Sequence, residues 1–373
     1  MYYSPLKSVK DYITENKLGL SARTVTDKVN LETFLDYNTQ MGNPTRVLTD
    51  HLKFLNTALQ QGTAGHQQNQ DFKSLTFFTR PQLNLQSRQL LQDRKMGNLL
   101  NSRSNSMSRY IRMMLDPRLG AIGDDTDGLL GSDLIDNNNV FIPFATNSYK
   151  SNSGWPDTVA PTKSTTPGRL KEEFAYIDGV TDMYHKFDLD VVFRNSQEEP
   201  AQQLFDTWIR NASLTFQGKM FPYYDMIKAN EMDYATRIYK LILTPDGKFV
   251  KKIASTGASF PVAISDGAVF NDSDANNRLE KTGDDFTVRF VSMGAIYNDP
   301  ITLMNFNLAV GYFHPGMQML NDGRRGHGMM QIDNDVKGLV FKQRYPRINL
   351  FTLELEWYIE QDLFEEAVRN GQL

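Results

Sequence analysis

The sequence predicts an α+β protein whose core is a mainly antiparallel, barrel-like β-sheet with one helix packed on it. Three observations within residues 183–264 carry this prediction. Apolar and polar residues alternate over 187–194, which is the period of a strand with one buried face. A helical stripe of apolar residues follows. Two further strand-like segments, 234–243 and 248–253, are then joined by turn-forming residues at 245–247.

The helix of this unit is predicted over 198–210. Its apolar stripe is made of Leu204, Phe205, Trp208 and Ile209. Two sequence signals indicate where this helix begins, and they give different first residues. Ser196 with Glu199 has the spacing of a capping box, whereas Pro200 is best tolerated in a first turn.

Residues 1–118 are predicted to form a mostly helical N-terminal region. The strongest helix is 45–60, where leucines recur every three or four residues. An apolar run within 72–85 predicts a buried strand that ends at Pro81. Residues 86–118 then carry a basic stripe on what we expect to be two helices, with Arg103, Arg109 and Arg112 as candidate interface residues. The stripe is typical of a solvated helix face, and contact with phosphates or an acidic protein is the alternative.

Residues 119–168 are predicted to be a loop and an extended arm. The segment 140–144 is expected to be a short strand. The connector 147–168 is far longer than an ordinary loop of about 4–6 residues. We predict that it lies on a neighbouring subunit, because Tyr149 and Trp155 are costly to leave in water. A disordered linker is the alternative.

Residues 169–373 are predicted to be the β-rich core domain, which ends with a strand and a short helix. Further strands are expected at 259–271 and 286–297, and an apolar segment spans 301–313. Clean alternation over 351–359 predicts a half-buried strand, and 362–368 a helix. Arg324 and Arg325 stand among glycines in the loop 314–338, which suits a flexible interface loop or a phosphate cradle.

Composition and motifs exclude more than they assign. At 373 residues the chain exceeds the roughly 250–300 that one core usually serves. A net charge of −4 does not indicate a nucleic-acid or membrane partner for the chain as a whole. The absence of cysteine excludes disulfides and thiolate metal sites and suits synthesis in a reducing cytoplasm. We expect no signal peptide and no membrane helix.

The search for reactive groups predicts that the chain is not an enzyme. The histidines are scattered, and no nucleophile, zinc or phosphate-loop motif occurs. Asp124, Asp125 and Asp127 resemble the start of a calcium loop, but the spacing does not fit an EF-hand, and the acidic cluster near Asp272 fails likewise. The sequence therefore predicts no catalytic residue, no cofactor and no metal ligand.

A sheet-rich chain with long irregular insertions and no reactive site is similar to structural proteins of tailed bacteriophages. Residues 170–310 resemble the tube-type fold of contractile-tail phages, with strands at 183–194, 236–243, 248–253 and 286–296 and the helix at 198–210. The resemblance implies a virion protein assembled in the host cytoplasm, in a tail tube or baseplate. It further implies six-fold rings of copies, contacts with other tail or neck proteins, and passive contact with DNA in a channel. A neck, head-connector or other capsid-associated protein is the first alternative, and a phage-encoded cell-wall hydrolase is the second.

Overall fold

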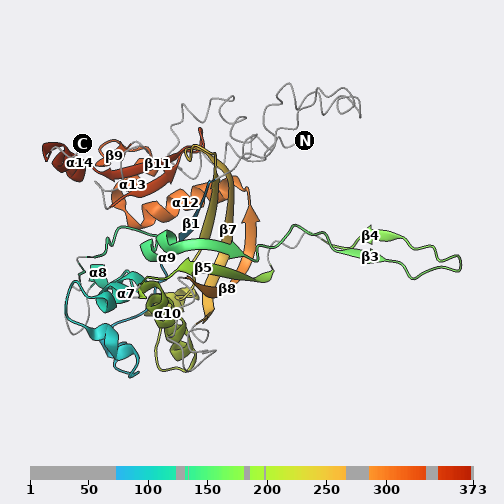
Figure 1. The fold of residues 1–373 in the computed structure, drawn as a ribbon, viewed down its shortest axis with the longest axis horizontal. Helices are drawn as coiled ribbons and strands as arrows, with labels where there is room; N and C mark the ends of the chain where they lie inside the picture. The colour runs from blue at the N-terminus through green and yellow to red at the C-terminus, as the bar shows by residue number, and fades with distance from the viewer. Residues whose placement is uncertain are drawn as a thin grey trace, which may run out of the picture.

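The centre of the molecule is a six-stranded antiparallel sheet in the order β1-β6-β7-β8-β5-β2 (Figure 1). The computed structural model describes residues 73–122, 131–132, 134–179, 185–196, 199–265, 285–332 and 343–370. The strands of the main sheet are β1 (Lys73–Phe78), β2 (Tyr149–Ser153), β5 (Lys186–Arg194), β6 (Ile238–Leu243), β7 (Val250–Ile264) and β8 (Asp285–Tyr297). The predicted helix 45–60 and the acidic clusters near Asp124 and Asp272 lie outside the described residues.

The sheet curls until it is nearly a barrel. Strands β6 and β2 are not neighbours in the sheet, yet the Lys240 ammonium of β6 donates a hydrogen bond to the Tyr149 hydroxyl of β2 at 3.3 Å. The predicted α+β fold with an antiparallel, barrel-like core is therefore confirmed. Strand β1, which belongs to region 1–118, forms one edge of this sheet. The described part of that region therefore packs into the same hydrophobic core as the β-rich region and is not a separate unit.

One face of the sheet is covered by α10 (Pro200–Phe216) and by helices from the segment before β2. Leu204, Phe205 and Trp208 of α10 are buried against strand residues such as Phe193 and Phe290. The α10 helix begins at Pro200, so the interpretation from proline was right. The capping box was wrong, because Glu199 makes no side-chain cap and has a φ of 52°. The other elements of this layer are α6 (Ser87–Leu90), η1 (Met96–Leu100), α7 (Met107–Leu115), α8 (Leu119–Ile122), α9 (Pro143–Ser148) and α11 (Tyr224–Ala229).

The opposite face is covered by α12 (Pro300–Phe313) and a second, three-stranded sheet (Figure 1). Phe306 of α12 packs edge-on against Tyr239 of β6, with 5.3 Å between ring centroids. The second sheet is ordered β10-β11-β9. The elements here are α13 (Pro315–Asn321), β9 (Met329–Ile332), β10 (Tyr345–Ile348), β11 (Leu355–Glu360) and α14 (Gln361–Arg369).

Several predicted boundaries are wrong. The strand expected at 351–359 begins only at Leu355, because Leu353 has a φ of 57°, outside the extended region. The expected strand at 140–144 is a single bridge at Phe141, after which Pro143 begins α9. The two helices expected over 86–118 are broken into short pieces. No described helix is both long enough and apolar enough to cross a bilayer.

Candidate subunit interface

The most prominent surface feature is an arm that leaves the body between β2 and β5 (Figure 1). We define the arm as residues 157–179. It contains β3 (Thr162–Ser164) and β4 (Ala175–Ile177), which pair only with each other among the described strands. Every residue from 161 to 179 is exposed. Its large exposed apolar side chains are Val159, Leu170, Phe174, Tyr176 and Ile177, with exposed fractions of 63%, 87%, 71%, 49% and 69%.

The base of the arm is held rigidly at Gly154. This residue has a φ of 108°, and a Cβ placed on it would lie 2.2 Å from the backbone oxygen of Asp188 in β5. Only glycine fits both the dihedral angle and the close approach. The neighbouring sheet strand therefore fixes the direction in which the chain leaves β2.

Trp155 belongs to the body and not to the free part of the arm. Its ring lies 6.0 Å from that of Phe187 and 5.9 Å from that of Tyr297, measured between centroids. The Tyr297 hydroxyl donates to the backbone oxygen of Pro156 at 2.6 Å. Tyr149 likewise stays in the sheet, donating to Asn152 Oδ1 at 2.8 Å, and the Lys240 ammonium lies over its ring. The projecting arm therefore differs from the predicted one: it spans 157–179 rather than 147–168, and it begins after both aromatic residues. Its contact with a neighbouring subunit stays a prediction.

The predicted basic residues do not form one surface. Arg112 is 1% exposed and donates to the Leu85 oxygen and the Ser87 hydroxyl, so its place on a solvent-facing stripe was a wrong prediction. Arg109 is half-buried and donates to the Ser102 oxygen at 2.6 Å, while Arg103 is exposed. Arg324 and Arg325 are exposed after α13, and Arg324 pairs with Asp322 at 3.3 Å.

Two buried charged residues that the sequence analysis did not single out tie this layer together. The Arg80 guanidinium donates to the backbone oxygens of Met113 and Met114 at the end of α7 and of Asn137 and Asn139. Burial lowers the pKa of Arg80 to about 10. The local signal is weak, because nothing in the sequence around Arg80 distinguishes it from a surface arginine.

Asp116 is the second of these residues. Its carboxylate accepts hydrogen bonds from the Leu85 amide and the Tyr223 hydroxyl, each at 2.8 Å, and from the Arg118 amide at 3.2 Å. Burial raises the pKa of Asp116 to about 6, because it penalises the charged form more than these bonds favour it. The carboxylate thus fastens the segment before α11 to the α6–α7 layer.

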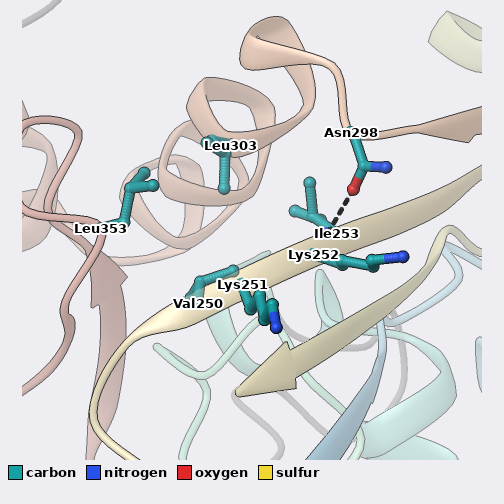
Figure 2. Close-up of a pocket in the computed structure, with 7 residues that line it drawn as sticks. All are labelled: Val250, Lys251, Lys252, Ile253, Asn298, Leu303 and Leu353. Carbon is teal, nitrogen blue, oxygen red and sulfur yellow. Dashed lines mark hydrogen bonds between the residues drawn. The ribbon is translucent and has the colours of Figure 1, made fainter. Parts of the chain in front are cut away.

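One hollow among the described residues does not resemble a catalytic site. Figure 2 shows a shallow hollow lined by Val250, Lys251, Lys252, Ile253, Asn298, Leu303 and Leu353. Its empty volume is about 200 Å³, including the part open to solvent, and no carboxylate lines it. Ligand sites are usually larger, at roughly 300–1,000 Å³. No group of three metal-ligating side chains occurs in the described ranges.

Comparison with protein families identifies the family of this chain. A family model described as "Putative phage tail tube protein" matches residues 22–373. A search of curated proteins found no match. Among solved structures, the chain is similar to the cap that terminates the tube of the anti-feeding prophage. The identity there is 11% and the TM-score 0.25, over 43% of this chain and 82% of that chain.

A second similar structure is the sheath/tube terminator of the extracellular contractile injection system PVC. The identity is 12% and the TM-score 0.24, over 43% of this chain and 87% of that chain. The family match spans nearly the whole sequence, including the six-stranded sheet and the arm. The chain belongs to this family of phage tail tube proteins, and it is a structural component of the virion tail.

Proposed function

We propose that this chain assembles with copies of itself into a six-fold ring, in the tail tube or in the baseplate where a tube begins. The observation that carries the proposal is the arm, which extends away from the body (Figure 1) and exposes five large apolar side chains to water. An isolated two-stranded hairpin is marginally stable at best. The arm therefore needs a partner surface to hold its shape.

A ring of copies supplies that partner at fixed stoichiometry. In a closed ring each subunit offers its arm to one neighbour and receives the arm of the other, so no arm is left uncovered. Other tail proteins, and DNA passing through the channel, complete the surroundings that we propose. Of the exposed arginines, Arg103 lies between η1 and α7, whereas the adjacent Arg324 and Arg325 lie between α13 and β9.

No observation favours the alternatives. A neck or head-connector position would also use a ring, but nothing in the described residues points to it. A hydrolase would need convergent carboxylates in a cleft. The hollow of Figure 2 instead presents two lysines, an amide and aliphatic side chains.

Removing the arm tests the proposal. The backbone amide of Asp178 donates to the Pro161 oxygen at 2.9 Å, so the two ends of the hairpin are adjacent. Residues 162–177 can therefore be replaced by an Asn-Gly turn. A deletion beginning at Tyr149 would instead remove β2 from the main sheet.

We expect purified wild-type protein to form rings or tubes in negative-stain images, with class averages showing six subunits. The shortened variant should remain monomeric by size-exclusion mass measurement, with an unchanged far-UV spectrum and melting temperature. Rings that form normally without the arm would show that the arm is not the assembly element. A wild-type monomer with lytic activity would reject the ring itself.

A further inference from the structure

A second exposed apolar surface lies where α10 ends and α11 begins. We call it the α11 surface and define it by Phe216, Phe221, Tyr224, Ile227 and Met232, whose exposed fractions are 93%, 57%, 81%, 52% and 41%. Surface apolar residues are ordinary when scattered singly, but here five of them fall within 17 positions of the chain around one short helix. Such a concentration is typical of a contact site.

Hydrogen bonds hold the α11 surface in shape. The Gln89 side chain bonds to both backbone groups of Phe221, accepting from its amide at 3.1 Å and donating to its oxygen at 3.2 Å. The Asn84 amide group donates to the same oxygen at 3.0 Å. Asp116 fixes Tyr223, and Arg118 pairs with Asp225 at 2.7 Å. The apolar side chains are therefore presented on a fixed backbone, as a docking surface requires.

The free part of the arm does not pack on the body of its own subunit, since every residue from 161 to 179 is exposed. Figure 1 shows the arm running outward from the body and away from α10, from whose end the α11 surface begins. The free part of the arm and the α11 surface are therefore two separate apolar features of one molecule. A head-to-tail contact between copies needs two such different surfaces, one to insert and one to receive.

We propose that the α11 surface is the docking site for the arm of a second copy of this chain. The inference depends on the ring assembly proposed above and names the receiving side of its interface. Phe174, Tyr176 and Leu170 of the arm match the surface in chemistry. Each side carries both signs of charge: Glu172 and Glu173 lie beside Arg169 and Lys171 at the end of the arm, and Lys219 and Lys228 lie near Asp225 and Glu231 at the surface. The proposal pairs the two glutamates with the two lysines.

Cysteine cross-linking tests the contact directly, because the natural chain contains no cysteine. Phe174→Cys in the arm is combined in turn with Phe221→Cys, Tyr224→Cys or Ile227→Cys on the α11 surface. A disulfide forms only where the two Cα atoms come within about 7 Å. Phe174→Cys combined with Val368→Cys is the matched control, because Val368 is 52% exposed on α14.

Oxidised double variants should give a ladder of covalent oligomers on non-reducing gels, and at least one pair should reach the closed ring. The single variants and the Val368 control should stay monomeric on the same gels. If rings form although Phe174→Cys links only to itself or to Val368→Cys, that result would support the ring assembly and overturn this docking site. Wild-type protein that forms no particle would reject the ring and the docking together.

Charge reversal provides a second measurement. Lys219→Glu with Lys228→Glu should weaken assembly at least tenfold in the protein concentration it requires. Adding Glu172→Lys and Glu173→Lys should restore most of that loss, and the rescue should fade as salt rises. Reversed surface charges that leave assembly unchanged, or arm charges that fail to rescue it, would contradict the proposed pairing.

Discussion

Asp116 joins two parts of the chain that are far apart in sequence, the α6–α7 layer and the segment that leads into α11. Its exposed fraction is 0%, and its partners come from Leu85, Arg118 and Tyr223. Burial removes water from a carboxylate and destabilises its charged form unless hydrogen bonds from the protein replace the lost hydration. The raised pKa of Asp116 means that its hydrogen bonds replace that hydration only in part. The residue therefore makes the stability of this fold depend on pH.

The direction of that dependence follows from the two pKa values of Asp116. The pKa is about 6 in the folded protein, against 3.8 for the unfolded reference, so the folded state binds the proton more tightly. The stabilising contribution is complete below pH 4 and is lost as the pH rises through 6. In the wild type, we expect Asp116 to lower the unfolding free energy by roughly 2–3 kcal/mol as the pH rises from 4 to 7. The Asp116→Asn variant should lack this decrease.

Urea denaturation of wild type and Asp116→Asn across that pH range measures the effect as the difference between the two curves. The other titrating groups cancel in that difference. Parallel curves would mean that the Asp116 carboxyl titrates alike in the folded and unfolded states.

Arginine shows how much a residue's role depends on partners that local sequence does not reveal. Arg103 and Arg112 occur in the same stretch and were grouped in one stripe, yet the first is exposed and the second is buried. The difference is set by Leu85 and Ser87, which lie about 25 residues earlier and provide acceptors for Arg112. Helical spacing alone does not contain that information.

At the scale of elements, the strands and helix that bury one face were predictable. β5 and α10 alternate between core and solvent along their length, so their own residues show periods of 2 and 3.6. The strands of the arm were not predictable, because all of their residues are exposed and no alternation exists. α12 could not be assigned to a type either, since apolar residues occur all around it.

Gly154 gives the arm its direction, and its replacement is a test at this scale. Gly154→Ala brings a Cβ against the Asp188 oxygen at 2.2 Å and places alanine at a φ of 108°. Because a backbone atom cannot move aside alone, we expect β2 to separate from β5 and the unfolding free energy to fall by about 3 kcal/mol or more.

Gly218→Ala is the matched control. Gly218 also has a positive φ, of 70°, but no atom lies within 4 Å of the position that a Cβ would take there. Its cost should be limited to the dihedral strain of about 1–2 kcal/mol. Equal costs for the two alanines, measured by thermal and urea denaturation, would show that the close approach at Gly154 relaxes freely.

For the whole molecule, the main sheet separates two hydrophobic cores and belongs to both. Adjacent residues in β1 and β6 point to opposite sides: Phe78 and Ile238 enter the core under α10, while Phe77 and Tyr239 enter the core under α12. The sequence length indicated more than one core, but it did not predict that one sheet would serve both. That arrangement depends on strand pairing between residues far apart, such as β1 with β6.

Because the two cores share these strands, we expect them to unfold together. Trp208→Ala removes a side chain that is 1% exposed in the first core, and Phe306→Ala removes one that is 0% exposed in the second. Each should cost about 3–5 kcal/mol. Each should also shift one cooperative transition, with the same midpoint by far-UV circular dichroism and by tryptophan fluorescence.

Phe221→Ala is the control. It truncates an exposed side chain and should change the unfolding free energy by at most about 0.5 kcal/mol. If Phe306→Ala instead unfolds in two steps, with the signal of Trp208 unchanged in the first, the second core and its small sheet form a separate unit.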